Sequence, residues 1–305
     1  MENREPNELN ASYLKNGFVV IRGLVSAKKI DSLLENYKKE VLFSNDYYLR
    51  QSTGKWQKNT LDQNGNSVES FLNVHDFRKQ EHFATCVREI QCSDEVQNAL
   101  RQITCDQSHK LIQSMLFDMN TATKAHQDWF YLDTVPNGHL LAGWFALEDI
   151  QEEAGRFFVI PGSHKSDFTL TENEKNSNPL YLKKLTDYMK EHHSEIVAPA
   201  LKKGDVLFWN SGTIHGALET KDISYSRKSL TAHYVPSQYG VGRKYDDTLL
   251  TIETGMHNGM EYRMYPNSNY SMKAKIKSDV FLYLWNHPRL MRLAQKTKKL
   301  IERNL

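Results

Sequence analysis

The strongest constraint on the fold is a series of short apolar runs, separated by turn residues, between residues 111 and 236. Runs of this length and spacing are typical of a β-sandwich or a β-barrel. The predicted strands are Leu111–Met119, Thr123–Leu132, His139–Leu147, Arg156–Ile160, Asp205–Trp209, Thr213–Leu218 and Arg227–Val235. Glycine, proline and asparagine lie in the intervals between them, so the sequence predicts an all-β core over this stretch.

Helices are predicted on both sides of this core. A strand at 17–23 is followed by Ser26 as a helix N-cap, and the apolar spacing after it predicts a helix over 27–42. Further helices are predicted over 79–104, over 179–193 and from Pro288, because proline is favoured at the first position of a helix. Residues 44–80 are polar and weakly patterned, and are predicted to be mainly loop.

The chain is therefore predicted to be mainly β with flanking helices, in a single domain over residues 1–305. Its parts are an N-terminal strand with helices (12–105), the β core (111–236) with an insertion at 165–200, and a C-terminal extension (240–305). The insertion and the 44–80 loop are expected to form the wall of a substrate pocket.

Composition excludes several classes of protein. The chain carries 39 Lys and Arg against 37 Asp and Glu, a balance that does not favour a nucleic-acid binder. Its 3 cysteines are an odd number without CxxC spacing, which indicates a reducing compartment. No apolar signal segment or run of membrane-spanning length is visible, so we expect a cytoplasmic protein without a transmembrane segment, acting on a small molecule.

Histidine and acid pairs point to a metal site. Two His-x-acid pairs occur, His126–Asp128 and His193–Glu195, and 12 histidines produce such pairs by chance. The second pair lies in a charged helical stretch, where this spacing turns the side chains apart. The first pair precedes the strand-favouring aromatic run 129–131, and on a strand its two side chains would share one face.

A third ligand is needed for a two-His, one-carboxylate facial triad, which is typical of non-haem Fe(II) oxygenases. His215 is the best candidate, because it follows a predicted strand, a tight turn and a second strand. The competing histidines are His75, His82, His109, His139, His164, His192, His233, His257 and His287.

Arg227 begins the last predicted strand of the core, twelve residues after His215. On that strand Arg227, Ser229, Thr231 and His233 would share one face. A buried arginine needs an anion, and a dicarboxylic 2-oxo acid supplies one: its distal carboxylate would pair with the guanidinium while its other end chelates iron.

These features together resemble the phytanoyl-CoA dioxygenase family of Fe(II)/2-oxoglutarate-dependent oxygenases. The resemblance covers most of residues 12–236. It is carried by Tyr13–Leu24, His126–Asp128, Gly143–Asp149, Gly155, Val159–His164, Lys203–Val206, Ile214–Gly216 and Arg227–Tyr234. It implies a cupin-like double-stranded β-helix, or jelly roll.

The same resemblance implies a set of functional residues. The metal ligands would be His126, Asp128 and His215, with Arg227 as the anchor for 2-oxoglutarate. Ser229, Gln113 and Trp144 are implied as further co-substrate contacts. Fe(II), 2-oxoglutarate and O2 would then hydroxylate a C–H bond of a metabolite, with release of succinate and CO2.

Two other functions stay open at this stage. One is a jelly-roll binding module without turnover, against which the full set of four residues argues. The other is a cupin-type dioxygenase that does not use 2-oxoglutarate and so needs no buried arginine. Within the family, a carboxylate at position 128 predicts oxygenation rather than halogenation, because halide-transferring relatives need that position vacant.

Overall fold

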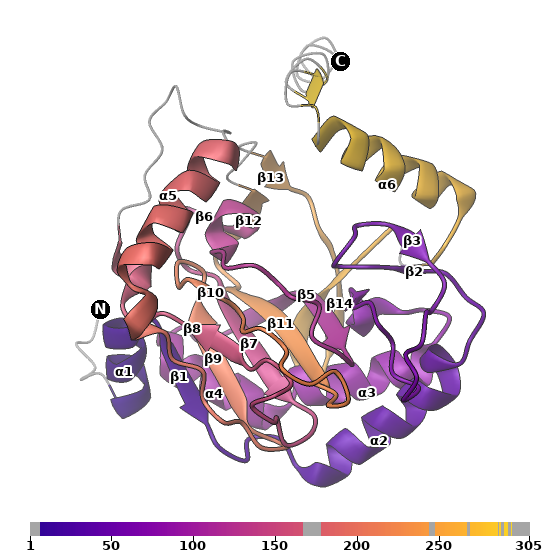
Figure 1. Cartoon of the computed structure of the whole chain (residues 1–305), viewed down its shortest axis with the longest axis horizontal. Helices are drawn as coiled ribbons and strands as arrows, with labels where there is room; N and C mark the ends of the chain where they lie inside the picture. Colours follow the sequence, from indigo (N-terminus) through magenta and orange to yellow (C-terminus); the bar gives the residue numbers. More distant parts are fainter. Residues whose placement is uncertain are drawn as a thin grey trace.

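The computed structural model describes residues 7–166, 178–243, 248–266 and 269–285, together with 287, 290, 291 and 294. Within this part of the chain, the centre is an eight-stranded sheet with the order β1–β9–β7–β11–β5–β15–β14, to which β4 adds by pairing with β5 (Figure 1). Its strands are β1 (Phe18–Ile21), β4 (Phe71–Leu72), β5 (His109–Phe117), β7 (Leu141–Ala146), β9 (Val206–Asn210), β11 (Ser229–Pro236), β14 (Glu253–His257) and β15 (Met260–Met264).

Smaller groups of strands complete the jelly roll. β8 (Phe157–Val159) pairs with β10 (His215–Ala217), and β6 (Asp133–Val135) pairs with β12 (Gly240–Arg243) and β13 (Thr248–Leu250). β2 (Tyr48–Leu49) and β3 (Trp56–Gln57) form a hairpin in the region predicted as loop. The predicted fold class, a jelly roll with flanking helices, is confirmed.

The helices are α1 (Glu8–Asn16), α2 (Ala27–Tyr37), α3 (Glu81–Gln91), α4 (Asp94–Thr104), α5 (Asn178–Glu191) and α6 (Met272–Trp285). Ser26 caps α2 by accepting a hydrogen bond from the Lys29 amide, as predicted, and a short π-helix continues it to Leu42. The predicted helix over 79–104 is two helices, because Ser93 caps a new one by accepting from the Val96 amide. The predicted helix opening at Pro288 lies largely outside the described residues.

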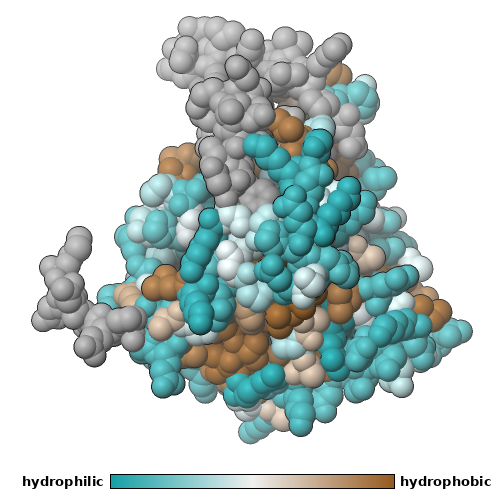
Figure 2. Space-filling view, turned by 60° about the vertical axis from the view of Figure 1, so that its left-hand side comes forward, coloured by the Kyte–Doolittle hydropathy of each residue, from teal (hydrophilic) through white to brown (hydrophobic). Residues whose placement is uncertain are grey.

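Both faces of the main sheet are buried, and each packs on a different layer. Phe145 and Phe208 point to a core shared with α2 and α3. Trp144 and Trp209 point to a second core, which lies between two sets of strands: the main sheet, and the smaller groups that contain β8 and β12. Helices α2, α3 and α4 accordingly lie along one side of the sheet in Figure 1. On the side that carries α1 and α5, the surface is mostly hydrophilic, with a broad hydrophobic area below the centre of the view and smaller ones elsewhere (Figure 2). The cavity of the candidate site lies on the face of the main sheet that bears Trp144 and Trp209.

One predicted strand is wrong, and strands in the C-terminal extension were not predicted. Thr123–Leu132 is not a strand: His126 makes a single bridge to His215, and Asp128–Phe130 forms a short 3-10 helix. The Phe130 ring stacks on Tyr181 of α5, 4.2 Å away, so contacts with the insertion outweigh the strand propensity of the aromatic run. The C-terminal extension, for which no strand was predicted, supplies β12 to β15, and β15 pairs in parallel with β5.

No helix in the described part of the chain combines the length and the apolar character that crossing a bilayer requires.

Two buried histidines that are not among the predicted metal ligands predict acid sensitivity of the fold. His75 bonds to Ser114 Oγ at 2.6 Å and to the Arg263 carbonyl at 2.9 Å, and His109 bonds to Thr104 Oγ1 at 3.0 Å. Burial lowers the pKa of His75 to about 3 and that of His109 to about 4. In the unfolded chain the pKa of a histidine is about 6.5, so below that pH the unfolded chain binds more protons than the folded one.

Above about pH 6.5 these two histidines therefore do not lower the free energy of unfolding. Below it, the free energy of unfolding falls as the pH drops, by up to about 1.4 kcal/mol per pH unit for each histidine. Urea denaturation of metal-free protein between about pH 7.5 and 5.5 measures this slope. A His75→Gln variant should show a shallower slope. An unfolding free energy that does not change over this range would contradict the prediction.

Candidate metal centre

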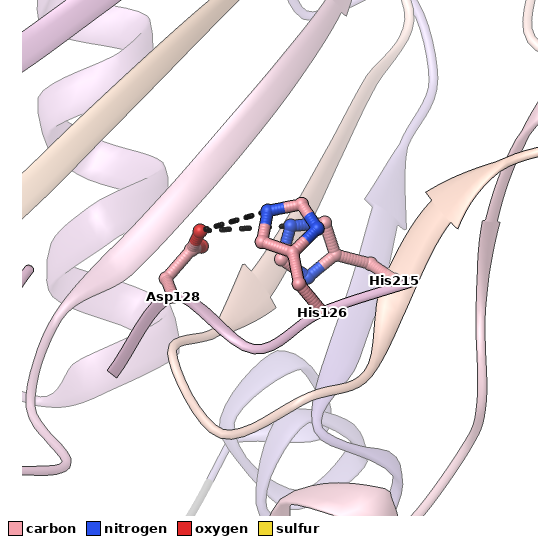
Figure 3. Close-up of side chains that lie close together, drawn as sticks. All are labelled: His126, Asp128 and His215. Atoms are coloured by element: carbon pink, nitrogen blue, oxygen red, sulfur yellow. Dashed lines mark ion pairs between the residues drawn. The ribbon is translucent and has the colours of Figure 1, made fainter. Parts of the chain in front are cut away.

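Three side chains predicted from the sequence meet between the two sets of strands. The Nε2 atoms of His126 and His215 each lie 3.6 Å from Oδ1 of Asp128. One ligand atom from each residue lies within 4.8 Å of the other two. Figure 3 shows both imidazoles turned toward the carboxylate from two separate segments of the chain. The arrangement provides two nitrogens and one oxygen that could hold a metal ion.

The backbone explains how residues so far apart in sequence meet. His126 and His215 form an antiparallel bridge with two amide-to-carbonyl bonds of 3.0 Å. The chain then turns at Asp128, whose carbonyl accepts from the Tyr131 and Leu132 amides. Tyr181 of α5 supports this turn, because its hydroxyl accepts a 3.0 Å bond from the Gln127 amide. A bridge followed by a turn, rather than a strand, brings the His126 and Asp128 side chains together.

Hydrogen bonds also fix the orientation of both imidazoles. Nδ1 of His126 donates to the Lys124 carbonyl, and Nδ1 of His215 donates to the Thr213 carbonyl, each at 2.9 Å. With the proton on Nδ1, the Nε2 lone pair faces Asp128. Metal-binding histidines in proteins are commonly held in this way by a carbonyl behind the ring.

The charge states suit a cation. Burial lowers the pKa of His215 to about 3, so this ring is neutral at pH 7. Burial alone would raise the pKa of the Asp128 carboxyl, but the imidazoles around it, His215 foremost, hold that pKa below its ordinary range. A neutral imidazole beside an ionised carboxylate is the form in which these residues bind metals.

Two residues without a predicted role contact the other oxygen of Asp128. Trp209 donates from Nε1 to Oδ2 at 2.9 Å, and Nε2 of His233 lies 3.5 Å from the same atom. His233 was one of the competing histidines, and the alternation along 227–233 already placed it on the same face as Arg227. Trp209 carried no comparable signal, because a tryptophan in an apolar strand is typical of a core.

Arg227 lies in the wall of the same cavity and is 3% exposed. Its Nη1 donates to the Gly155 carbonyl at 3.0 Å, and its guanidinium carbon lies 5.9 Å from the Trp144 ring centroid. Nε has no partner, and in the described part of the chain no carboxylate forms an ion pair with it. Burial lowers the pKa of this guanidinium to about 10, so it keeps its charge at pH 7. A charge buried in this way calls for an anionic partner, and the described residues supply none.

The wall of this cavity also includes Gln51, Met115 and Thr231. Trp144 belongs to this wall, and its ring lies 5.9 Å from that of Phe157. Ser229 and Gln113 do not belong to it: the Ser229 hydroxyl donates to the Arg227 carbonyl, and Gln113 lies beside His233 in the sheet. Co-substrate contacts by these two residues stay predictions.

Comparison with known proteins gives a family match over residues 13–228, described as "Phytanoyl-CoA dioxygenase (PhyH)". The chain is 33% identical over 120 residues to phytanoyl-CoA dioxygenase domain-containing protein 1 of Danio rerio, covering 37% of this chain and 39% of that protein. It is 26% identical over 254 residues to the peroxisomal phytanoyl-CoA dioxygenase of Bos taurus, covering 76% and 70%. The first of these matches thus spans about two fifths of the relative's length.

Solved structures share the fold at low sequence identity. The structure of EctD from S. alaskensis with 2-oxoglutarate and 5-hydroxyectoine has a TM-score of 0.56 at 17% identity, covering 88% of each chain. The epimerase SnoN in complex with Fe3+, alpha ketoglutarate and nogalamycin RO has a TM-score of 0.54 at 16% identity, covering 86% of this chain and 96% of that one.

Proposed function

Since the chain belongs to the phytanoyl-CoA dioxygenase family, we propose that it is an Fe(II)- and 2-oxoglutarate-dependent dioxygenase that hydroxylates a C–H bond of a small-molecule metabolite. Succinate and CO2 would be the co-products. The observation that carries the proposal is a single cavity lined by His126, Asp128, His215 and a buried arginine that has no counterion among the described residues. We place the activity in the cytoplasm, where the three free cysteines, Cys86, Cys92 and Cys105, would stay reduced.

The residues present fit iron. Two imidazole nitrogens and a carboxylate oxygen on one side of a metal form the facial triad of non-haem Fe(II) oxygenases, and they leave positions for a co-substrate and O2. His126 is the ligand nearest to solvent, with a side chain 24% exposed, whereas His215 and Asp128 are buried. A metal would therefore enter past His126.

The residues present also fit a dicarboxylate. A guanidinium offers two parallel N–H donors to a carboxylate, and such a pair is stronger and more specific than a lysine contact. Arg227 has donor capacity beyond its bond to Gly155, and the Trp144 ring beside it closes one side of the space. 2-Oxoglutarate held there by its distal carboxylate would place its 2-oxo acid end toward the triad.

Bound Fe(II) with 2-oxoglutarate supplies the oxidative chemistry, which side chains alone cannot perform. The part of this chain is to orient and to shield. The Lys124 and Thr213 carbonyls fix the imidazoles, Trp209 fixes the carboxylate, and the rings of Trp144 and Phe157 line the space beside them. Because Asp128 fills the position that halide transfer would need vacant, the proposed outcome is oxygenation.

Two alternatives make different predictions. A binding module would bind metal and diacid but release no succinate, and a cupin-type dioxygenase would consume O2 without 2-oxoglutarate. Structures with this fold include proteins titled epimerase and carbocyclase, so the product has to be identified. A gain of one oxygen atom in the substrate would distinguish hydroxylation from epimerisation and from ring closure.

The direct test loads the purified chain with Fe(II) without oxygen, then adds 2-oxoglutarate, O2 and a pool of metabolites. We expect succinate in amounts that match the hydroxylated product, and none from metal-free protein. Liquid chromatography with mass spectrometry measures both. A chain that takes up iron but releases no succinate with or without added metabolites would contradict the enzyme proposal.

A further inference from the structure

The two oxygens of Asp128 have different surroundings. Oδ1 faces the Nε2 atoms of His126 and His215, each at 3.6 Å. Oδ2 faces away from this pair: it accepts the Trp209 indole N–H at 2.9 Å and lies 3.5 Å from Nε2 of His233. Resting on the proposed function, we propose that His233 is a positioning residue, which together with Trp209 holds Oδ2 so that Asp128 offers only Oδ1 to the metal.

The sheet builds this arrangement across three neighbouring strands. Trp209 on β9 and His233 on β11 both pair with Ala142 on β7, so the three residues form one row. Ala142 is small, and the centroids of the two flanking rings are 6.4 Å apart. The Trp209 and His233 rings therefore flank the small Ala142 side chain, and the Asp128 carboxylate oxygen Oδ2 lies near a ring nitrogen of each.

The local backbone supports a specific placement of His233. The register between β11 and β5 shifts directly after it, between His233 and Tyr234, which marks a bulge or irregularity. Bulges near active sites change the direction of a side chain. His233 is 4% exposed, and its Nδ1 has no hydrogen-bond partner among the residues that the structure describes. A neutral ring must carry its single proton on Nε2 to donate to Asp128, which leaves Nδ1 as the unused acceptor.

The consequence concerns the number of open metal positions. Three protein ligands on one face leave three positions, of which 2-oxoglutarate would take two and O2 one. A carboxylate that bound through both oxygens would occupy one of them. Two N–H donors on Oδ2 oppose this, so His233 would keep the O2 position open without touching the metal.

The test compares two replacements of His233. His233→Leu removes the donor while keeping a bulky side chain, whereas His233→Gln keeps an N–H donor at about the distance of Nε2. Removal of such an outer partner typically costs 10–100-fold in metal affinity. We expect His233→Leu to weaken Mn(II) binding by about 10–100-fold, and His233→Gln to restore most of it. Equilibrium titration with Mn(II) alone measures both, independently of turnover.

The absorption spectrum of the Co(II)-loaded protein reports coordination. We expect the spectrum of His233→Leu to differ from wild type and that of His233→Gln to resemble it. Urea unfolding of the metal-free variants separates a loss of fold from a loss of affinity. If wild type bound no Mn(II), the proposed function itself would fail.

If wild type bound Mn(II) and His233→Leu bound it equally well, only the role of His233 would be overturned. Equal losses in both variants, with both Co(II) spectra changed, would make His233 a direct ligand and would also overturn the proposal.

Discussion

Replacing Asp128 with alanine is expected to abolish both divalent-metal binding and release of succinate. Asp128 is the single carboxylate of the triad, so its loss leaves no negatively charged ligand to balance a divalent cation. The loss should exceed the ~10–100-fold cost of removing an outer partner, because here a ligand itself disappears. Mn(II) titration and succinate release from the Fe(II)-loaded protein measure the two effects.

Asp128→Asn should be almost as damaging, for a reason specific to this site. Trp209 donates a hydrogen bond to the outer oxygen, and Nε2 of His233, which we propose as a second donor, lies 3.5 Å from it. The single carbonyl oxygen of asparagine would turn toward them, and its NH2 group, which cannot ligate, would face the two imidazoles. An Asn variant that bound Mn(II) as tightly as wild type would contradict this assignment of the carboxylate.

The chain contains a matched control for these replacements. His193 and Glu195 have the same His-x-acid spacing, but they lie in a short 3-10 helix and both are exposed. Glu195→Ala should leave Mn(II) affinity and succinate release unchanged. If it lowered either as strongly as Asp128→Ala, the site would have been placed at the wrong pair.

Much of this fold was predictable because short apolar runs between turn residues are a local property of the sequence. Strands β5, β7, β9 and β11 bury side chains on both faces, and their near-continuous apolar runs were visible in the sequence. The turn at Asp128 was not, because it depends on Tyr181, more than fifty residues later in the chain. The hairpin of β14 and β15 was missed because β14 is largely exposed and lacks an apolar pattern.

The candidate site shows the same division between local and distant information. The spacing of His126 and Asp128, and the anion requirement of Arg227, follow from residue chemistry. Which histidine completes the set depends on long-range pairing. His75, a competitor in the sequence, uses both ring nitrogens in hydrogen bonds that join β5 to β15. His233 reaches the same carboxylate as His215 but from the opposite side, a distinction that only coordinates can make.

The largest effect on co-substrate binding is expected from Arg227→Gln. Truncating one partner of a buried, hydrogen-bonded charge pair costs about 2–5 kcal/mol. At about 1.4 kcal/mol per tenfold change, the affinity for 2-oxoglutarate should fall by roughly 30- to several thousand-fold. Arg227→Lys keeps the charge but loses the forked geometry, so it should fall between wild type and Arg227→Gln. Titration of the Mn(II)-loaded protein with 2-oxoglutarate measures the series.

The effect on stability distinguishes a ligand-binding arginine from a structural one. Without ligand, Arg227 is a buried charge with one hydrogen bond to Gly155, so Arg227→Gln should leave the free energy of unfolding unchanged or raise it. Wild type should gain about 2.7 kcal/mol from 2-oxoglutarate at a hundredfold excess over Kd, and the variant should gain almost nothing. Urea unfolding with and without 2-oxoglutarate, both with Mn(II), measures this difference.

Arg50 is the matched control, because it is equally buried but lies outside the cavity wall. Its Nη2 donates to Asn59 at 2.6 Å and its guanidinium lies 4.4 Å from the Phe71 ring centroid, whereas its Nε and Nη1 have no hydrogen-bond partner among the described residues. Arg50 therefore shares the burial and the unpaired nitrogens of Arg227 and differs from it in lying outside the cavity. Arg50→Gln should lower the free energy of unfolding and leave 2-oxoglutarate affinity unchanged, the opposite of Arg227→Gln on both measurements. If the two variants behaved alike, the charge at 227 would serve the fold, and the case for a dicarboxylate in this cavity would be lost.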